Sequence, residues 1–240
     1  MAMHKLEKMN NYPKTIVFVE TTLCKSYIEN IPNLTCSSAI KRGDIYGLSE
    51  EFTRIIIVDG LFGNTRSVWQ REITYALSIG IEVYGTSSMG ALRAAELSGY
   101  GMKGYGWVFN CLCQGLLEGD DEVALIYSRH KDGRIIHHTI TFCNLYWNLL
   151  QLLSANIITL EEVRNILGAM REIPFFKRSI EETKKILSAQ LSISASDELI
   201  SRLKHIQYDI KAIDFLGLLN ILYPIHQMPL KREERQICTI

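Results

Sequence analysis

Residues 81–97 read IEVYGTSSMGALRAAEL, and this stretch is the most informative one about the fold. Its first part, Ile81–Thr86, is a short run rich in β-branched residues, which favours a buried strand. From Met89 onward apolar residues recur at helical spacing, and a glycine just beyond the stretch is typical of a helix C-terminus. The stretch therefore predicts a strand that runs directly into a helix through two serines, Ser87 and Ser88.

Two more strands are predicted upstream of this stretch. Thr15–Val19 and Arg54–Val58 are further β-branched runs. Between the second and third strands, residues 68–79 have helical spacing and end at a glycine. A strand, a helix and a strand in this order form a β-α-β unit, whose strands are parallel. We therefore expect a Rossmann-like α/β fold, with a mostly parallel sheet flanked by helices.

The second half of the chain is predicted to be helical. Four segments carry apolar residues three and four positions apart, at 140–153, 159–167, 179–187 and 197–206. Thr159, followed by two glutamates, is typical of a helix N-terminus. Before these helices, residues 123–127 are a candidate for one more strand. We expect an α/β core domain over 1–135 and a helical C-terminal lobe over 136–240.

Composition and charge narrow the class of protein. With 47% hydrophobic and 22% charged residues, the chain has the composition of an ordinary globular protein. Its 26 basic and 26 acidic residues balance, which disfavours nucleic acid as the main partner. Residues 1–13 lack the apolar core of a signal peptide, and no apolar run approaches the roughly 20 residues of a membrane span. We expect a cytoplasmic protein that binds neither nucleic acid nor membrane.

Polar residues follow two of the predicted strands at one edge of the sheet. Asp59 and Gly60 come directly after the strand that ends at Val58, and Ser87 and Ser88 follow the third strand. In open parallel sheets, ligands bind at the carboxyl ends of the strands. We therefore place the candidate site in a crevice that these residues share.

Two interpretations of the serine turn stay open. Thr86–Gly90 approximates the nucleophile elbow of hydrolases, in which small neighbours allow a sharp turn that exposes a hydroxyl beside helix-start amides. Ser88 is the nucleophile in that register, and Ser87 is the alternative. In the second interpretation, one of the two serines is only the N-cap of the helix. The pattern by itself favours this second interpretation.

Three charged residues near the turn, Asp59, Arg93 and Glu96, also have ordinary structural interpretations. Asp59 either orients a base or holds a substrate amine, or it forms a turn with Gly60. Arg93 and Glu96 lie three residues apart on the predicted helix, so on their own they form an ordinary surface ion pair.

No base, metal site or cofactor is identified by the sequence. The histidines lie in no informative context, although His137 and His138 are candidates to reach Ser88 in space. The six cysteines lack paired CxxC spacing, which disfavours a zinc site. Cys111 and Cys113 either lie close together through packing or chance, or they take part in redox or sulfur-handling chemistry. We expect neither a metal nor a cofactor.

Several short motifs occur in the order found in the TfuA-like proteins. They are Arg42–Tyr46, Val58–Phe62, Glu72–Ile73 with Ala76–Leu77, Ser87–Leu97, Gly101–Met102 and Asp120–Ala124. Each motif alone is weak, but the ordered set is specific. The sequence therefore resembles the TfuA-like family over about residues 17–124.

The resemblance implies an accessory protein of a YcaO-type ATP-dependent enzyme, which modifies peptide backbones in thioamide formation and peptide natural-product biosynthesis. Such a protein would recruit a ubiquitin-like sulfur carrier, cleave its C-terminal thiocarboxylate and pass sulfide to the YcaO-type enzyme for use on a precursor peptide. Cleavage of a thiocarboxylate is acyl transfer, which suits a serine beside helix-start amides. Arg93 would stabilise the developing charge or the free carboxylate, and Asp59 or Glu96 would orient the proton acceptor.

Further residues of the matched motifs are expected to bind the substrate: Gly60, Met89, Gly90, Arg42 and Asp44. The chain also departs from the family pattern. It has Glu20–Leu23 where relatives often have a Gly-Pro-Ser-Leu turn, and Gln70 and Tyr127 where they often have histidine. A family histidine base is therefore not carried over, and a non-catalytic adaptor that docks the peptide or carrier and activates the YcaO-type enzyme stays as the alternative. A stand-alone serine peptidase or esterase is least favoured, because it lacks a defined base.

Overall fold

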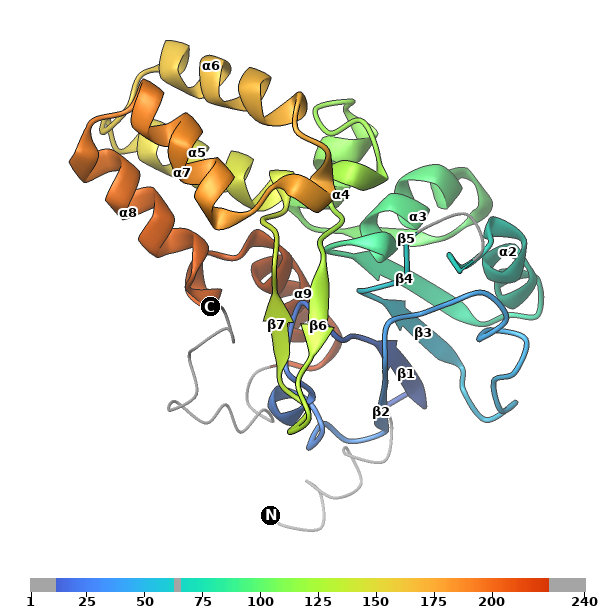
Figure 1. The fold of residues 1–240 in the computed structure, drawn as a ribbon. Coiled ribbons are helices and arrows are strands. Elements are labelled where there is room, and N and C mark those ends of the chain that lie inside the picture. Colours follow the sequence, from blue (N-terminus) through green and yellow to red (C-terminus); the bar gives the residue numbers. More distant parts are fainter. Residues whose placement is uncertain (1–11, 63–65, 225–240) are drawn as a thin grey trace. The chain divides into compact units, whose positions relative to one another are not determined.

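The computed structural model of the chain describes residues 12–62 and 66–224, which fall into two units (Figure 1). The described part of the first unit comprises residues 12–62, 66–116 and 214–224. The described part of the second unit comprises residues 117–213. Within these ranges, no helix combines the length and the apolar character that crossing a lipid bilayer requires.

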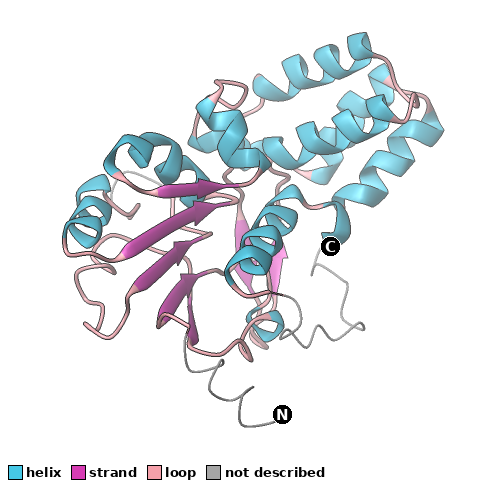
Figure 2. Ribbon diagram, turned by 180° about the vertical axis from the view of Figure 1, so that it is seen from behind, coloured by secondary structure: helices cyan, strands magenta, loops and turns pink. Residues whose placement is uncertain are grey.

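Five strands of the described first unit form one parallel sheet in the order β2-β1-β3-β4-β5 (Figure 2). The strands are β1 (Thr15–Phe18), β2 (Leu34–Ser37), β3 (Arg54–Ile57), β4 (Glu82–Thr86) and β5 (Lys103–Tyr105). The predicted parallel α/β fold is confirmed, and β1, β3 and β4 are the three predicted strands. β2 and β5 are not predicted by the sequence, because both are short edge strands with partly exposed side chains that lack a continuous apolar run.

The core of this unit lies between the central strands and two helices, α2 (Gln70–Ser78) and α3 (Met89–Leu97). Ile55 and Ile57 of β3 are fully buried in this core, together with Ile73 of α2 and Ala94 of α3. Ile56 is equally buried but points to the other face of the sheet, because side chains alternate along a strand. Burial on both faces explains why β3 reads as a continuous apolar run.

The first unit is completed by α4 (Trp107–Cys113) and by the later part of α9 (Ile210–Leu222), a helix that the sequence analysis did not predict. Both carboxylate oxygens of Asp214 in α9 accept hydrogen bonds from the first turn of α4, at 2.8 Å from the amide nitrogen of Trp107 and 2.9 Å from that of Val108. Just after α9, the hydroxyl of Tyr223 donates to Oγ1 of Thr15 at 2.7 Å. The chain therefore returns to the sheet after the helical segment.

The described second unit contains a two-stranded hairpin and four complete helices. The elements are β6 (Tyr127–Arg129), β7 (Ile135–His137), α5 (Phe142–Ser154), α6 (Leu160–Arg171), α7 (Ile180–Gln190) and α8 (Ile193–Leu203). A helix is confirmed in each of the four predicted segments, although α8 begins and ends three to four residues before the predicted 197–206. Thr159 caps α6 by accepting a hydrogen bond from the amide of Glu162. The strand predicted at 123–127 is wrong, because Val123 and Ala124 are buried in a loop and β6 begins only at Tyr127.

An acidic turn, residues 120–122, anchors this unit through two arginines. The fully buried guanidinium of Arg178 donates to the carbonyl oxygen of Asp121 at 2.7 Å and lies 3.0 Å from its carboxylate. Arg171 pairs with the buried carboxylate of Glu122 at 2.9 Å. A buried guanidinium requires such partners, because an unpaired buried charge is costly. The acidic motif of the family resemblance therefore has a structural role in this chain.

Candidate functional site

The strand order places a topological switch point between β1 and β3. The chain leaves β1 towards β2 on one side and returns to β3 on the other. The connections on the two sides of such a point diverge and leave a crevice at the carboxyl ends of the strands, where α/β proteins bind ligands. The loops that follow β1, β3 and β4 all leave from this edge of the sheet.

Asp59 ties the loop after β1 to the end of β3. Its Oδ2 accepts hydrogen bonds from the amides of Glu20, Thr21 and Thr22 at 2.8 to 2.9 Å. Its Oδ1 accepts one from the hydroxyl of Thr22 at 2.6 Å. The side chain is only 2% exposed, so these donors compensate the burial of its charge. Asp59 thus lies at the predicted edge, and its partners belong to the loop after β1 rather than to Gly60.

The turn after β4 has an unusual backbone conformation at Ser87. The φ angle of Ser87 is +68°, in the left-handed region that non-glycine residues seldom adopt. Ser88 occupies the N-cap position of α3, but its side chain makes no capping hydrogen bond to the helix. Both residues are buried, with exposed fractions of 0% and 3%. Strained conformations of this kind concentrate at functional sites.

Glycines press the start of α3 against the ends of β3 and β4. A Cβ atom at Gly90 would lie 1.7 Å from the carbonyl oxygen of Ile57, and one at Gly85 would lie 2.0 Å from the carbonyl oxygen of Gly90. A Cβ atom at Gly60 would lie 2.5 Å from Cγ of Met89. The structure therefore brings the segment around Asp59 and Gly60 into contact with the turn that leads into α3, as the sequence predicts.

Two backbone amides at the start of α3 remain as donors for a ligand. The amide of Ser88 donates to the carbonyl oxygen of Thr86 at 2.9 Å, and that of Gly90 donates to Val58 at 3.3 Å. The amides of Met89 and Ala91 have no acceptor among the described residues. These two groups, at the positive end of the helix dipole, are the ones able to bind an oxyanion.

Arg93 and Glu96 form the predicted ion pair, with 2.6 Å between Nη1 and Oε2. Nε of Arg93 also donates to the carbonyl oxygen of Val68 at 3.1 Å, and Gln70 donates to the same Glu96 oxygen at 3.0 Å. Gln70 stands where relatives often have histidine, and here it belongs to this network. The network links α3 to the segment that precedes α2, and the charge of Arg93 is balanced by Glu96.

Trp69, which the sequence did not single out, stacks against two arginines. The Cζ atoms of Arg42 and Arg71 lie 3.4 and 3.6 Å from the ring centroid of Trp69. Two guanidinium groups cannot share one face at these distances, so the indole is sandwiched between them. Both arginines are exposed, and neither pairs with a carboxylate among the described residues. In the sequence, only the two-residue spacing of Trp69 and Arg71 could have indicated this contact.

The remaining predicted binding residue, Asp44, supports the loop that carries Arg42. Its carboxylate accepts hydrogen bonds from the amide of Lys41 at 2.9 Å and from the Lys41 amine at 2.8 Å. The buried carboxylate of Glu72 in turn accepts a hydrogen bond from the amide of Gly43 at 2.8 Å. Asp44 and Glu72 thus stabilise the loop that carries Arg42. These hydrogen bonds do not involve the serine turn.

No histidine lies among the described residues of the first unit. His137 ends β7 and His138 follows it, both in the second unit, and Nε2 of His138 lies 2.8 Å from the hydroxyl oxygen of Ser128. His4 and His226 fall outside the described residues. A histidine base for the serine turn therefore stays a prediction without a contact to support it.

The close cysteine pair is expected to react unequally with thiol reagents. Cys111 is buried in α4, and burial, with Asp214 nearby, raises the pKa of its thiol to about 11. Cys113 is exposed, as is Cys24. Because the thiolate is the reactive form, iodoacetamide at pH 7.5 should label Cys113 and Cys24 and leave Cys111 unmodified until the pH approaches 11. Peptide mass spectrometry measures the labelling of all three cysteines, and labelling of Cys111 at the rate of Cys113 at pH 7.5 would contradict the expectation.

The fold defines an α/β protein whose candidate site residues lie at the carboxyl edge of a parallel sheet, with a second unit that is largely helical. The family model of the TfuA-like proteins matches residues 59–179, just over half of the chain. The match begins at Asp59 and includes the serine turn. The chain belongs to the TfuA-like family, and it is therefore an accessory protein associated with a YcaO-type enzyme. A comparison with curated proteins gives no match.

Proposed function

We propose that this chain releases sulfide from the C-terminal thiocarboxylate of a ubiquitin-like sulfur carrier and delivers it to the YcaO-type enzyme for thioamide formation on a precursor peptide. The observation that carries the proposal is the φ of +68° at Ser87, in a buried strand-to-helix turn at the ligand edge of the sheet. Around Ser87 the residues two positions away are Gly85 and Met89. This register supplies the leading glycine of a nucleophile elbow, which the register centred on Ser88 lacks.

The proposed chemistry is acyl transfer. Oγ of Ser87 attacks the thiocarboxylate carbon, and the new C–O bond produces a tetrahedral oxyanion. The C–S bond then breaks, and the sulfur leaves as hydrosulfide with the bonding electrons and with the proton that the serine hydroxyl gave up. The carrier stays attached to Ser87 as an acyl ester. Water hydrolyses that ester and restores the serine together with a free carboxylate. The amides of Met89 and Ala91 are the proposed oxyanion donors.

Charged residues around the turn receive supporting roles in this proposal. Asp59 is a positioning residue, because four donors of the loop after β1 already use its oxygens. Arg93 and Glu96 hold α3 against the adjoining segment through their ion pair and the contact with Val68. The exposed arginines on Trp69 are the proposed contact for acidic groups of the carrier.

The test compares sulfide release from a thiocarboxylated carrier by the wild type, Ser87→Ala and Ser88→Ala. We expect Ser87→Ala to lower the rate about 100-fold or more, because it removes the nucleophile, and Ser88→Ala to lower it by less than about 10-fold. A sulfide electrode measures the rate in single-turnover and steady-state conditions. Ser98→Ala is the matched control, since Ser98 is an exposed residue at the far end of α3. Undiminished release by both variants at the turn would remove serine catalysis.

A non-catalytic adaptor is the second candidate function. It is favoured by the burial of both serines and by the lack of a histidine among the described residues of the first unit. An adaptor would release no sulfide from the carrier by itself, yet it would accelerate thioamide formation by the YcaO-type enzyme when free sulfide is supplied. The same two serine variants would then leave that acceleration unchanged.

A further inference from the structure

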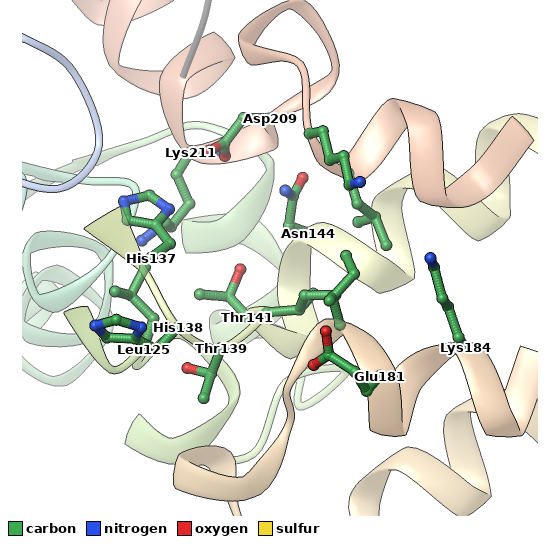
Figure 3. A pocket seen from close by; sticks show the side chains of 14 residues that line it. Leu125, His137, His138, Thr139, Thr141, Asn144, Glu181, Lys184, Asp209 and Lys211 are labelled. Atoms are coloured by element: carbon green, nitrogen blue, oxygen red, sulfur yellow. The ribbon is translucent and has the colours of Figure 1, made fainter. Parts of the chain in front are cut away.

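The second unit contains a cavity of about 400 Å³, which is the size of many small-molecule sites (Figure 3). Every residue that lines it belongs to the described second unit, so the cavity is built by that unit alone. Neither the residues of the serine turn nor Asp59 and its hydrogen-bond partners line this cavity. Its lining combines buried polar side chains, charged side chains and an apolar wall.

Three helices begin at this cavity. Thr141 is the N-cap of α5, Ile180 is the first residue of α7, and Asp209 immediately precedes α9, and all three residues line the cavity. Helix N-termini carry partial positive charge and present amide donors. Convergence of three of them makes the cavity electropositive even before charged side chains are considered.

Asn144 presents an amide group to the cavity. The residue is 7% exposed, and its Oδ1 accepts hydrogen bonds from the amide of Ile210 and from Nδ2 of Asn148, each at 3.2 Å. These two bonds fix the orientation of the side-chain amide, so its Nδ2 points away from α9. Nδ2 of Asn144 has no acceptor among the described residues. A buried amide with donors left over is costly unless a ligand or solvent accepts from it.

Thr141 adds a second donor beside Asn144. Thr141 is 4% exposed. It occupies the N-cap position of α5, but its hydroxyl makes no capping hydrogen bond to that helix. Ser179 and Ser192 do cap α7 and α8 through their hydroxyls, as N-cap residues usually do. Figure 3 shows the side chain of Thr141 between the wall formed by His137 and Lys211 and the wall formed by Glu181.

Cationic side chains outnumber carboxylates around the cavity. Lys184, Lys204 and Lys211 line it, against Glu181 and Asp209. Lys211 is only 1% exposed, and Asp209 uses Oδ1 to accept a hydrogen bond from the Lys211 amide at 2.9 Å, which caps α9. The balance of charge, added to the helix N-termini, favours a bound anion.

We propose that this cavity binds a small organic anion. Thr141, Asn144 and Lys211 contact its phosphate or carboxylate group, and its apolar part packs against Leu125, Ile140 and Leu203. The volume admits a ring or short chain together with the acidic group and excludes a macromolecule. The site is independent of the proposed sulfide release, so each can fail without the other.

The test is isothermal titration of the full chain with phenyl phosphate, benzoate and benzyl alcohol, which share a ring and differ in their polar group. We expect at least one anion to bind, and Thr141→Val and Lys211→Met each to raise its Kd about 10-fold or more. Benzyl alcohol should bind at least 10-fold more weakly than that anion. The tighter of the two anions identifies the acidic group that the site prefers.

Lys185→Met is the matched control for Lys211→Met. Lys185 has the same charge as Lys211, but it is an exposed residue of α7 and lies outside the cavity lining. Its Kd should equal that of the wild type. Thermal melts show whether each variant is folded, and Thr141→Val keeps the shape of the side chain if Lys211→Met does not fold. The proposal is overturned if neither anion binds the wild type, if Thr141→Val binds as tightly as the wild type, or if benzyl alcohol binds as tightly as the anions.

Discussion

Gly90→Ala is expected to lower the free energy of unfolding of the first unit by about 4 kcal/mol or more. The new Cβ atom would lie 1.7 Å from the carbonyl oxygen of Ile57 and 3.3 Å from Cα of Gly85. Both neighbours are backbone atoms, so no side chain can move aside to make room. Relief requires α3 to shift away from β3, which would also break the hydrogen bond from the Gly90 amide to Val58. Denaturant unfolding followed by far-UV circular dichroism measures the loss.

Gly99→Ala provides the matched control for this substitution. Gly99 lies just beyond α3, and a Cβ atom there would have no other atom within 4 Å. Its backbone is outside the positive φ region, so alanine should change the unfolding free energy by less than about 1 kcal/mol. Equal unfolding midpoints for the two variants would show that α3 is not pressed against β3 as described.

Asp59→Asn is expected to cost about 3 kcal/mol of stability and to release the loop after β1. Oδ2 of Asp59 accepts three amide hydrogens, and Oδ1 accepts the hydroxyl of Thr22. An asparagine has the same shape but only one acceptor oxygen. Its NH₂ group must therefore lie against either the three amides or the Thr22 hydroxyl, and those hydrogen bonds are lost. Thermal unfolding measures the stability, and faster proteolytic cleavage near residues 20–22 would report the freed loop.

Asp44→Asn serves as the comparison for Asp59→Asn. Asp44 also accepts from a backbone amide and an amine, but its partner Lys41 is largely exposed and the pair is near the surface. Ion pairs in such positions contribute little, so we expect a loss below about 1 kcal/mol. If Asp59→Asn were as mild as Asp44→Asn, the assignment of Asp59 as the anchor of the loop would be wrong.

Local pattern was sufficient for the elements whose burial is continuous or periodic. β3 is buried along almost its whole length, and α6 begins at a threonine with a capping box. Such elements are specified by neighbouring residues in the chain, so their sequence predicts them. β5 has no such pattern, because pairing with β4 defines it as a strand. The strand predicted at 123–127 is the opposite case. Val123 and Ala124 are apolar because tertiary packing buries them in a loop, and in the sequence such apolar residues resemble a strand.

The place of the candidate site also followed from local pattern, whereas the partners of its residues did not. Parallel strands put Asp59 and the serine turn at one edge, and the three glycines beside them allow the close contact. The acceptor role of Asp59 depends on a loop 37 to 39 residues away in the sequence. The strained φ of Ser87 likewise results from fitting a non-glycine residue into the turn between β4 and α3.

The amino-acid sequence was sufficient to predict the parallel α/β class, the edge of the sheet that carries the candidate site residues, and the family. These follow from period, spacing and short motifs, which involve residues close together in the chain. Three features came to light only in the folded structure: two arginines stack on Trp69, Asp214 caps α4 from 106 to 107 residues away, and three helix N-termini converge on one cavity. Contacts between such distant residues leave no periodic signal, because each depends on how the packed elements meet rather than on the neighbours of either residue.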